Sequence, residues 1–98
     1  MDYIKLIIVG NLIRDAEVKQ ARDGESKYAD FTVAASRNGD EKTFYPVRAF
    51  GKLGESCEML KKGDHVLVVG EFEVSSYEDE NGGKRMSFRV VADTFRKL

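Results

Sequence analysis

Three glycine-containing turns divide this 98-residue chain into short segments and leave little room for any structure other than paired strands. Asp23-Gly24 and Asn38-Gly39 are dipeptides that favour tight β-hairpins. A third turn lies at residues 79–84, where two acidic residues precede Asn-Gly-Gly. Short segments joined by such turns pair as antiparallel neighbours, so the sequence predicts a β-meander.

The segments between these turns have the residue patterns of strands. Ala29, Phe31 and Val33 alternate with polar residues, as they do on a strand with one buried face. Gly10 interrupts the first apolar segment, and a glycine in such a place marks a bulge or a bend. The first expected strand is residues 4–12, with a kinked continuation through residues 16–21. The other four expected strands are residues 28–36, 44–50, 65–77 and 84–95.

One segment has a different period. In residues 52–62, Leu53, Cys57 and Leu60 recur at the spacing of one helix face. Two lysines close the segment before Gly63, which suits a helix C-terminus with a glycine cap. The sequence therefore predicts a short helix of about ten residues that is stable only when docked on the strands.

Together these elements predict an all-β domain that spans residues 1–98. Five strands with one short helix between the third and the fourth describe the OB-fold, a five-stranded Greek-key barrel. OB-folds bind oligonucleotides and oligosaccharides on the face of their second and third strands. In this count the third strand is residues 44–50, so that strand is the first place to look for a binding site.

The composition narrows the possible functions. The chain is 42% hydrophobic and 34% charged, and its longest apolar run, residues 6–9, is far too short to cross a membrane. Cys57 has no second cysteine to pair with, and with one histidine a His/Cys metal cluster is excluded. The N-terminus lacks the pattern of a secretory signal, so we expect a cytoplasmic protein. No cofactor is expected either.

The strand at residues 44–50 has an unusual face. Phe44, Arg48 and Phe50 share one side of it, whereas Val47 and Ala49 share the other. Two aromatic rings on either side of an arginine suit the stacking of unpaired bases, and the guanidinium can stack or meet phosphates. The alternative is that both rings are buried in the core and the arginine reaches out from an edge.

Several segments, in order along nearly the whole chain, resemble the bacterial single-stranded DNA-binding protein family. The most specific of them is Val47-Arg48-Ala49-Phe50-Gly51-Lys52-Leu53. The other matching segments are residues 8–12, 14–18, 31–34, 60–63, 68–70, 76–79 and 90–93.

The resemblance implies an OB-fold that wraps single-stranded DNA without sequence specificity as a homo-oligomer, a dimer or a tetramer. Phe44 and Phe50 match positions where the family has base-stacking aromatics, and Tyr77 matches a third. Tyr3, Ile4 and Leu6 match the strand through which family members associate, although core packing is the simpler explanation for them. Lysines that match basic positions of the family are Lys19, Lys52 and Lys62.

Four further basic residues are candidates for contact with phosphates. Arg14 lies just past the kink of the first strand, and Arg37 flanks the second turn. Lys84 and Arg85 follow the third turn and can either contact phosphates or be solvated turn charges.

The sequence also departs from the family. It has no tryptophan, although the family commonly stacks bases on tryptophan, and Glu71 and Glu73 stand where many members are basic. Family members usually continue into an acidic tail that recruits replication and repair enzymes, whereas this sequence ends at Leu98. Net charge is −1, so any positive binding surface has to come from the distribution of charge.

The main expectation is therefore non-specific binding of single-stranded DNA in replication, recombination or repair, in the bacterial cytoplasm or by a phage-encoded protein. The alternative is an OB-fold adaptor that binds a replication or repair protein. An enzyme is poorly supported, because no nucleophile–histidine pair, phosphate loop or metal-binding carboxylate cluster is recognisable. Oligosaccharide binding is open on the fold alone.

Overall fold

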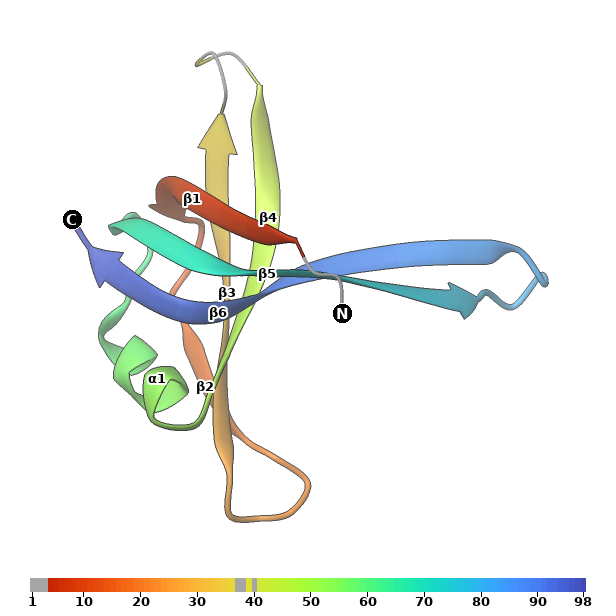
Figure 1. Ribbon diagram of the computed structural model, residues 1–98, viewed down its shortest axis with the longest axis horizontal. Helices are drawn as coiled ribbons and strands as arrows, with labels where there is room; N and C mark the ends of the chain where they lie inside the picture. The colour runs from red at the N-terminus through yellow and green to blue at the C-terminus, as the bar shows by residue number, and fades with distance from the viewer. Residues whose placement is uncertain (1–3, 37–38, 40) are drawn as a thin grey trace.

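The computed structural model describes residues 4–36, 39 and 41–98, and its strands form one curved sheet (Figure 1). No helix in this described part of the chain is long and apolar enough to cross a membrane. The elements are β1 (Lys5–Leu12), β2 (Glu17–Gln20), β3 (Lys27–Ser36), β4 (Lys42–Phe50), α1 (Gly51–Ser56), the 3₁₀ turn η1 (Cys57–Met59), β5 (His65–Glu78) and β6 (Lys84–Lys97).

The sheet closes on itself as a barrel. Its strand order is β1-β5-β6-β4-β3-β2, and β1 also pairs with β3, which completes the ring. All pairings are antiparallel except that of β4 with β6, where Val47 lies opposite Val90. This ring, with one helix between β4 and β5, confirms the predicted OB-fold.

The first strand differs from the prediction. Instead of one long kinked strand, the chain forms β1 and a separate short β2, so the helix follows the fourth strand rather than the third. The interruption is caused by hydrogen bonds to other segments: the N–H of Ile13 donates to the carbonyl of Thr32 at 3.2 Å. The N–H of Ala16 donates to the carbonyl of Leu60 at 3.0 Å.

The core is made by the inward faces of the strands, as the alternation predicts. Val33, Val66, Val68 and Val90 are completely buried. Gly10 is required where β1 crosses β3, because a Cβ atom there would lie 2.2 Å from the carbonyl oxygen of Ala34. Its place in the first strand thus marks a close approach of two backbones.

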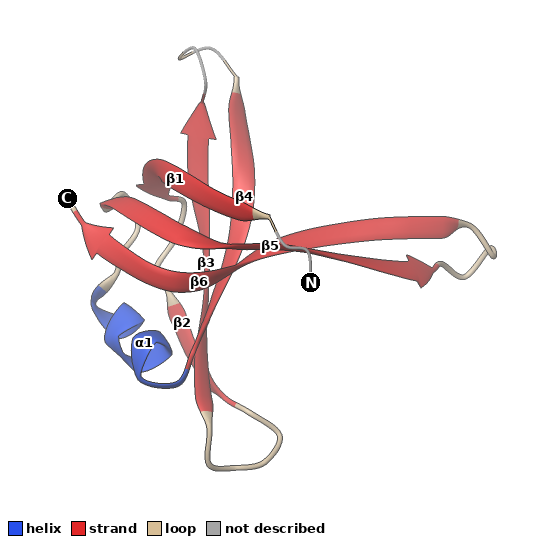
Figure 2. Ribbon diagram, viewed as in Figure 1, coloured by secondary structure: helices blue, strands red, loops and turns tan. Residues whose placement is uncertain are grey.

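The helix covers one end of the barrel beside β2 and β3 (Figure 2). Cys57 and Leu60 are completely buried, as predicted for its packing face, and burial raises the pKa of the Cys57 thiol to about 11. The predicted C-terminal end at residue 62 is wrong: the helical turns end at Met59, and Leu60 is extended. Gly63 lies in a separate turn, where its N–H donates to the carbonyl of Leu12 at 2.8 Å.

Beyond the barrel, β5 and β6 continue together as a two-stranded arm (Figure 1). Their pairing runs without a break from Gly70 opposite Ala92 to Glu78 opposite Lys84. A register irregularity between Val69 and Gly70 lies within the barrel part, since Gly70 and Glu71 still pair with β1, and Val90 and Val91 with β4. The arm is the long hairpin that the turn at residues 79–84 predicts.

The contact between α1 and the barrel can be tested at Gly54, which is buried. A Cβ atom there would lie 2.4 Å from the carbonyl oxygen of Ala49, so Gly54→Ala must push the helix off the barrel. We expect the free energy of unfolding to fall by about 1–3 kcal/mol, the usual cost of overpacking, in urea denaturation. Glu58→Ala, on the exposed side of η1, is the control and should leave stability nearly unchanged. Equal stability of the two variants would contradict this packing.

Candidate nucleic-acid interface

The outer face of β4 carries two exposed aromatic rings. Phe44 is 54% exposed and Phe50 is 51% exposed, whereas Val47 and Ala49 between them point inward and are 2% and 0% exposed. The predicted division of this strand into two faces is therefore confirmed. The alternative that Phe44 and Phe50 belong to the core is wrong.

The neighbouring strand β3 extends this face. Antiparallel pairing places Tyr28 opposite Phe50, and the centres of their rings are 6.3 Å apart at an angle of 48°. The same register places Asp30 opposite Arg48 and Ala34 opposite Phe44. Tyr28 thus adds a third ring beside Phe50, a residue that sequence reasoning missed because only the strand register brings it there.

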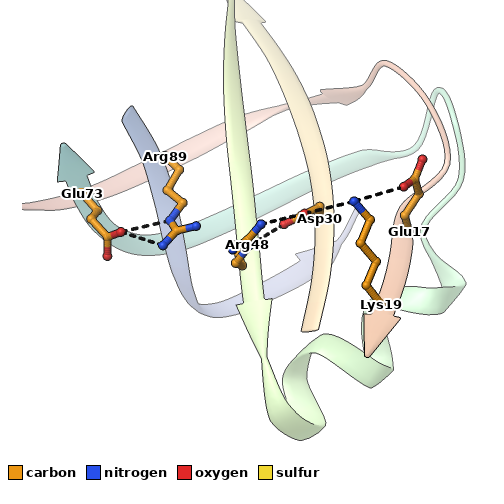
Figure 3. Close-up of polar contacts among 6 residues, drawn as sticks. All are labelled: Glu17, Lys19, Asp30, Arg48, Glu73 and Arg89. Carbon is orange, nitrogen blue, oxygen red and sulfur yellow. Dashed lines mark hydrogen bonds and ion pairs between the residues drawn. The ribbon is translucent and has the colours of Figure 1, made fainter. Parts of the chain in front are cut away.

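Arg48 is held on this face by two neighbours, Asp30 (Figure 3) and Tyr28. Its Nε and Nη2 donate to the two carboxylate oxygens of Asp30 at 2.8 and 3.0 Å. Its Cζ atom lies 4.5 Å from the centre of the Tyr28 ring, which is the geometry of a cation–π contact. The guanidinium is therefore fixed in position and its charge is compensated.

The same carboxylate also attracts Lys19 from β2. The Lys19 ammonium lies 3.6 Å from Asp30 and 3.6 Å from Glu17. Partial burial would raise the pKa of Asp30, but the hydrogen bonds and charge of Arg48, with those of Lys19, outweigh it and lower that pKa. In turn, the hydrogen bond to Asp30 raises the pKa of Arg48 against the effect of burial. Asp30 and Arg48 therefore both stay ionised at neutral pH.

An open cleft of about 360 Å³ adjoins these residues. Three arginines line it: Arg14, Arg48 and Arg89. Arg89 donates to one oxygen of Glu73 through Nε at 3.0 Å, and its Nη2 lies 2.8 Å from the same oxygen (Figure 3). Arg14 is exposed and forms no ion pair with any described residue. Asp15, Glu17 and Asp30 also line the cleft, so its three arginines face three carboxylates.

The arm continues the same face away from the barrel. Arg48 pairs with Val91 of β6, and the alternation along β6 puts Arg89 and Arg85 on the side of Val91. Tyr77 lies opposite Arg85 and is 53% exposed. The structure therefore places Tyr77 on the face that carries the β4 aromatics, farther out along the arm.

The remaining predicted residues are more dispersed. Lys52 is exposed on α1 directly after Phe50, and the exposed Lys62 donates its backbone N–H to Asp15, which lines the cleft. Arg85 donates to Asp79 at 3.1 Å. Lys84 lies opposite Glu78, on the other face of the arm from Tyr77.

Arg37 lies outside the described residues. The structure thus brings Phe44, Phe50, Arg48 and Lys19 together on the barrel and extends their face to Tyr77. It does not bring Lys84 to that face.

Comparison with known proteins matches residues 3–98 to the family model described as the single-strand binding protein family. A single-stranded DNA-binding protein of Wolinella succinogenes is 35% identical over 98% of this chain and 64% of its own length. One of Clostridium perfringens is 34% identical over 93% of this chain and 63% of its own length. Single-stranded DNA-binding protein 1 of Clostridium acetobutylicum is 30% identical over 96% of this chain and 92% of its own length.

The chain thus spans less than two thirds of the first two of these relatives and nearly all of the third. The family model covers the whole barrel and the arm, including every element of the outer face. By both comparisons, this chain belongs to the single-strand binding protein family.

Proposed function

We propose that this protein binds single-stranded DNA without sequence preference along the outer face of β3 and β4 and along the arm. The observation that carries the proposal is the pair of half-exposed rings, Phe44 and Phe50, at the two ends of one strand face. Solvent-exposed aromatics on a rigid sheet offer stacking surfaces to bases of any kind. The names of the relatives point to the same ligand.

The charges suggest that stacking contributes more than phosphate attraction. Arg48, Lys19 and Arg89 each have a carboxylate partner. The nearby cations with no ion pair among the described residues are Arg14, Lys42, Lys52 and Lys62. Each phosphate neutralised on a single strand contributes about −0.7 to the slope of log affinity against log salt. A shallow slope is therefore expected. Duplex DNA, whose bases are already stacked, should bind poorly.

The acidic residues Glu71 and Glu73 of β5, which favour the alternative of an OB-fold adaptor for another protein, are partly neutralised. Glu73 pairs with Arg89, and Glu71 lies 4.0 Å from Lys5, which also binds Asp93 at closer range. These glutamates are therefore a weaker basis for binding a basic protein partner than the sequence alone indicated.

We propose that the protein acts in replication, recombination or repair in the cytoplasm, as a binding protein and not as an enzyme.

We further propose that the protein forms a homo-oligomer through β1. Residues 5–10 of β1 pair only with β5 among the described strands, because β3 reaches only Asn11 and Leu12. Two large apolar residues of this segment are exposed, Ile7 by 72% and Val9 by 45%, and so is Ile4 directly before it, by 58%. An open strand edge with apolar side chains is a template for pairing with a second copy.

The stacking role can be measured at Phe44 and Phe50. Each replacement by alanine should weaken binding of a fluorescent oligo-dT of about 35 nucleotides, by about 1–3 kcal/mol per lost stack, in fluorescence anisotropy. Met59→Ala is the control, since Met59 is 53% exposed on η1 away from this face. Unchanged affinity in both phenylalanine variants would exclude the β4 face as the stacking platform.

The arm offers a matched pair of side chains on opposite faces. Tyr77 is 53% exposed on the face of Arg48, and Met86 is 75% exposed on the other face. Tyr77→Ala should weaken oligo-dT binding by about 1–3 kcal/mol, whereas Met86→Ala should not. If Met86→Ala is the more harmful change, DNA follows the opposite face of the arm.

The oligomer can be tested at Ile7, the most exposed of the β1 residues named above. Size-exclusion chromatography with light scattering should give a multiple of the 11.0 kDa protomer for the unmodified protein. Ile7→Glu should shift the mass toward one protomer, since it places a charge in the apolar contact. Met86→Glu is the control on the arm, and a monomeric unmodified protein would contradict the proposal.

A further inference from the structure

One of the two bidentate edges of the Arg48 guanidinium is already occupied. Nε and Nη2, which form one donating edge of the group, are both engaged by the carboxylate of Asp30 at 2.8 and 3.0 Å. Phosphate recognition by arginine commonly uses two parallel N–H donors in this way. A phosphate that approached this edge would have to displace a carboxylate that is already ion-paired and partly buried. The three remaining N–H groups belong to a guanidinium whose charge Asp30 already compensates.

The flat surface of the guanidinium is, in contrast, well prepared for a ligand. Tyr28 supports it at 4.5 Å, and Asp30 fixes its orientation from the side. The side chain of Arg48 retains 28% of its exposure and lines the open cleft beside Phe31, Thr32 and Pro46. Bases stack on guanidinium planes as well as on aromatic rings.

We propose that Arg48 is a base-stacking residue whose charge is withheld from the phosphates by Asp30. Tyr28 and Asp30 are its positioning residues. The Tyr28 ring supports the guanidinium plane, and the two hydrogen bonds to the Asp30 carboxylate fix its orientation on the outer face of β3 and β4. This inference rests on the single-stranded DNA binding proposed above. It adds a stacking position between Phe44 and Phe50, next to Phe50 on the same strand face, and assigns a role to two residues that the sequence did not indicate.

The arrangement has a consequence for the dependence of binding on salt. A cation that is already neutralised by a carboxylate releases no counterion from DNA, so Arg48 should add nothing to the salt slope. If Arg48 instead bound a phosphate, its removal would reduce the magnitude of the slope by about 0.7. The stacking role and the phosphate role therefore predict different salt slopes. The difference becomes visible only when affinity is measured at several salt concentrations.

The decisive variant is Arg48→Lys, which keeps the charge and removes the plane. We expect oligo-dT affinity to fall about tenfold, the loss of one stacked base, with an unchanged salt slope. The oligo-dT affinity of Arg48→Gln should fall by a similar factor, again with an unchanged salt slope. Full affinity in Arg48→Lys, or a slope reduced by about 0.7 in Arg48→Gln, would overturn the proposal in favour of a phosphate contact.

Asp30→Asn tests the positioning role. Removal of the carboxylate frees the guanidinium for phosphates, whereas Lys19 keeps Glu17 as a partner at 3.6 Å. The slope should therefore become steeper by about 0.7, and adding Arg48→Gln should restore the original slope. The same Arg48→Gln change should thus affect the slope only when Asp30 is absent. An equal effect in both backgrounds would show that Asp30 does not control the charge of Arg48.

Two controls show whether a loss of affinity comes from the missing support of the Tyr28 ring or from a failure to fold. Tyr28→Phe keeps the supporting ring and should retain affinity, whereas Tyr28→Leu should lose about as much as Arg48→Lys. Equal affinity of Tyr28→Leu and Tyr28→Phe would exclude the supporting role of the ring. Circular dichroism and thermal unfolding identify any variant that fails to fold, and Arg48→Lys retains an ion-pair partner for Asp30.

The unmodified protein and Phe44→Ala complete the set. If the unmodified protein does not bind oligo-dT, the proposed function fails. If it binds and Phe44→Ala weakens it while Arg48→Lys does not, only the inference about Arg48 fails.

Discussion

The pairing register of β3 with β4 determines both the core and the candidate interface. Nine residue pairs, from Tyr28–Phe50 to Ser36–Lys42, alternate between the two sides of the sheet. The inward pairs include Phe31–Val47, which is part of the core, and the outward pairs include Asp30–Arg48. A slip of one residue would expose the first pair and bury the second. The cost of exposing the core thus fixes the geometry of the binding face.

The outer face of β3 and β4 exposes flat side chains, whereas most of its positive charge is paired with carboxylates. The protein has a net charge of −1, and three cations near the cleft are paired with carboxylates. Such pairs contribute little to stability where they are exposed, but they restrict the orientation of the side chains that they join. For a ligand whose bases can stack on any flat surface, fixed orientation is more useful than a larger positive potential. The absence of tryptophan is therefore compatible with a stacking surface made from phenylalanine, tyrosine and arginine.

Much of the fold follows from local patterns in the sequence, because alternation and glycine turns are local properties. The outward direction of Phe44 and Phe50 follows from the burial of Val47 and Ala49 between them. The contact of Arg48 with Asp30 and Tyr28 does not follow, since it depends on a register between two strands. The separate β2 and the early end of the helix were missed for a related reason. Both are set by hydrogen bonds to distant backbone groups, such as the one between Ala16 and Leu60.

The arm shows how a face is maintained where no second layer of structure supports it. Cross-strand contacts stabilise it near the barrel: the rings of Phe72 and Phe88 are 5.5 Å apart on one side, and Glu73 binds Arg89 on the other. At the tip, the carboxylate of Asp79 accepts hydrogen bonds from the N–H groups of Asn81 and Gly83.

The hydrogen bond from the Gly83 backbone, followed by that from the side chain of Arg85, lowers the pKa of Asp79. The carboxylate therefore stays ionised at neutral pH and keeps the turn closed. Since the turn sets the register of the arm, and the register decides which face Tyr77 and Arg85 share, Asp79 connects the conformation of the tip to the continuity of the candidate interface.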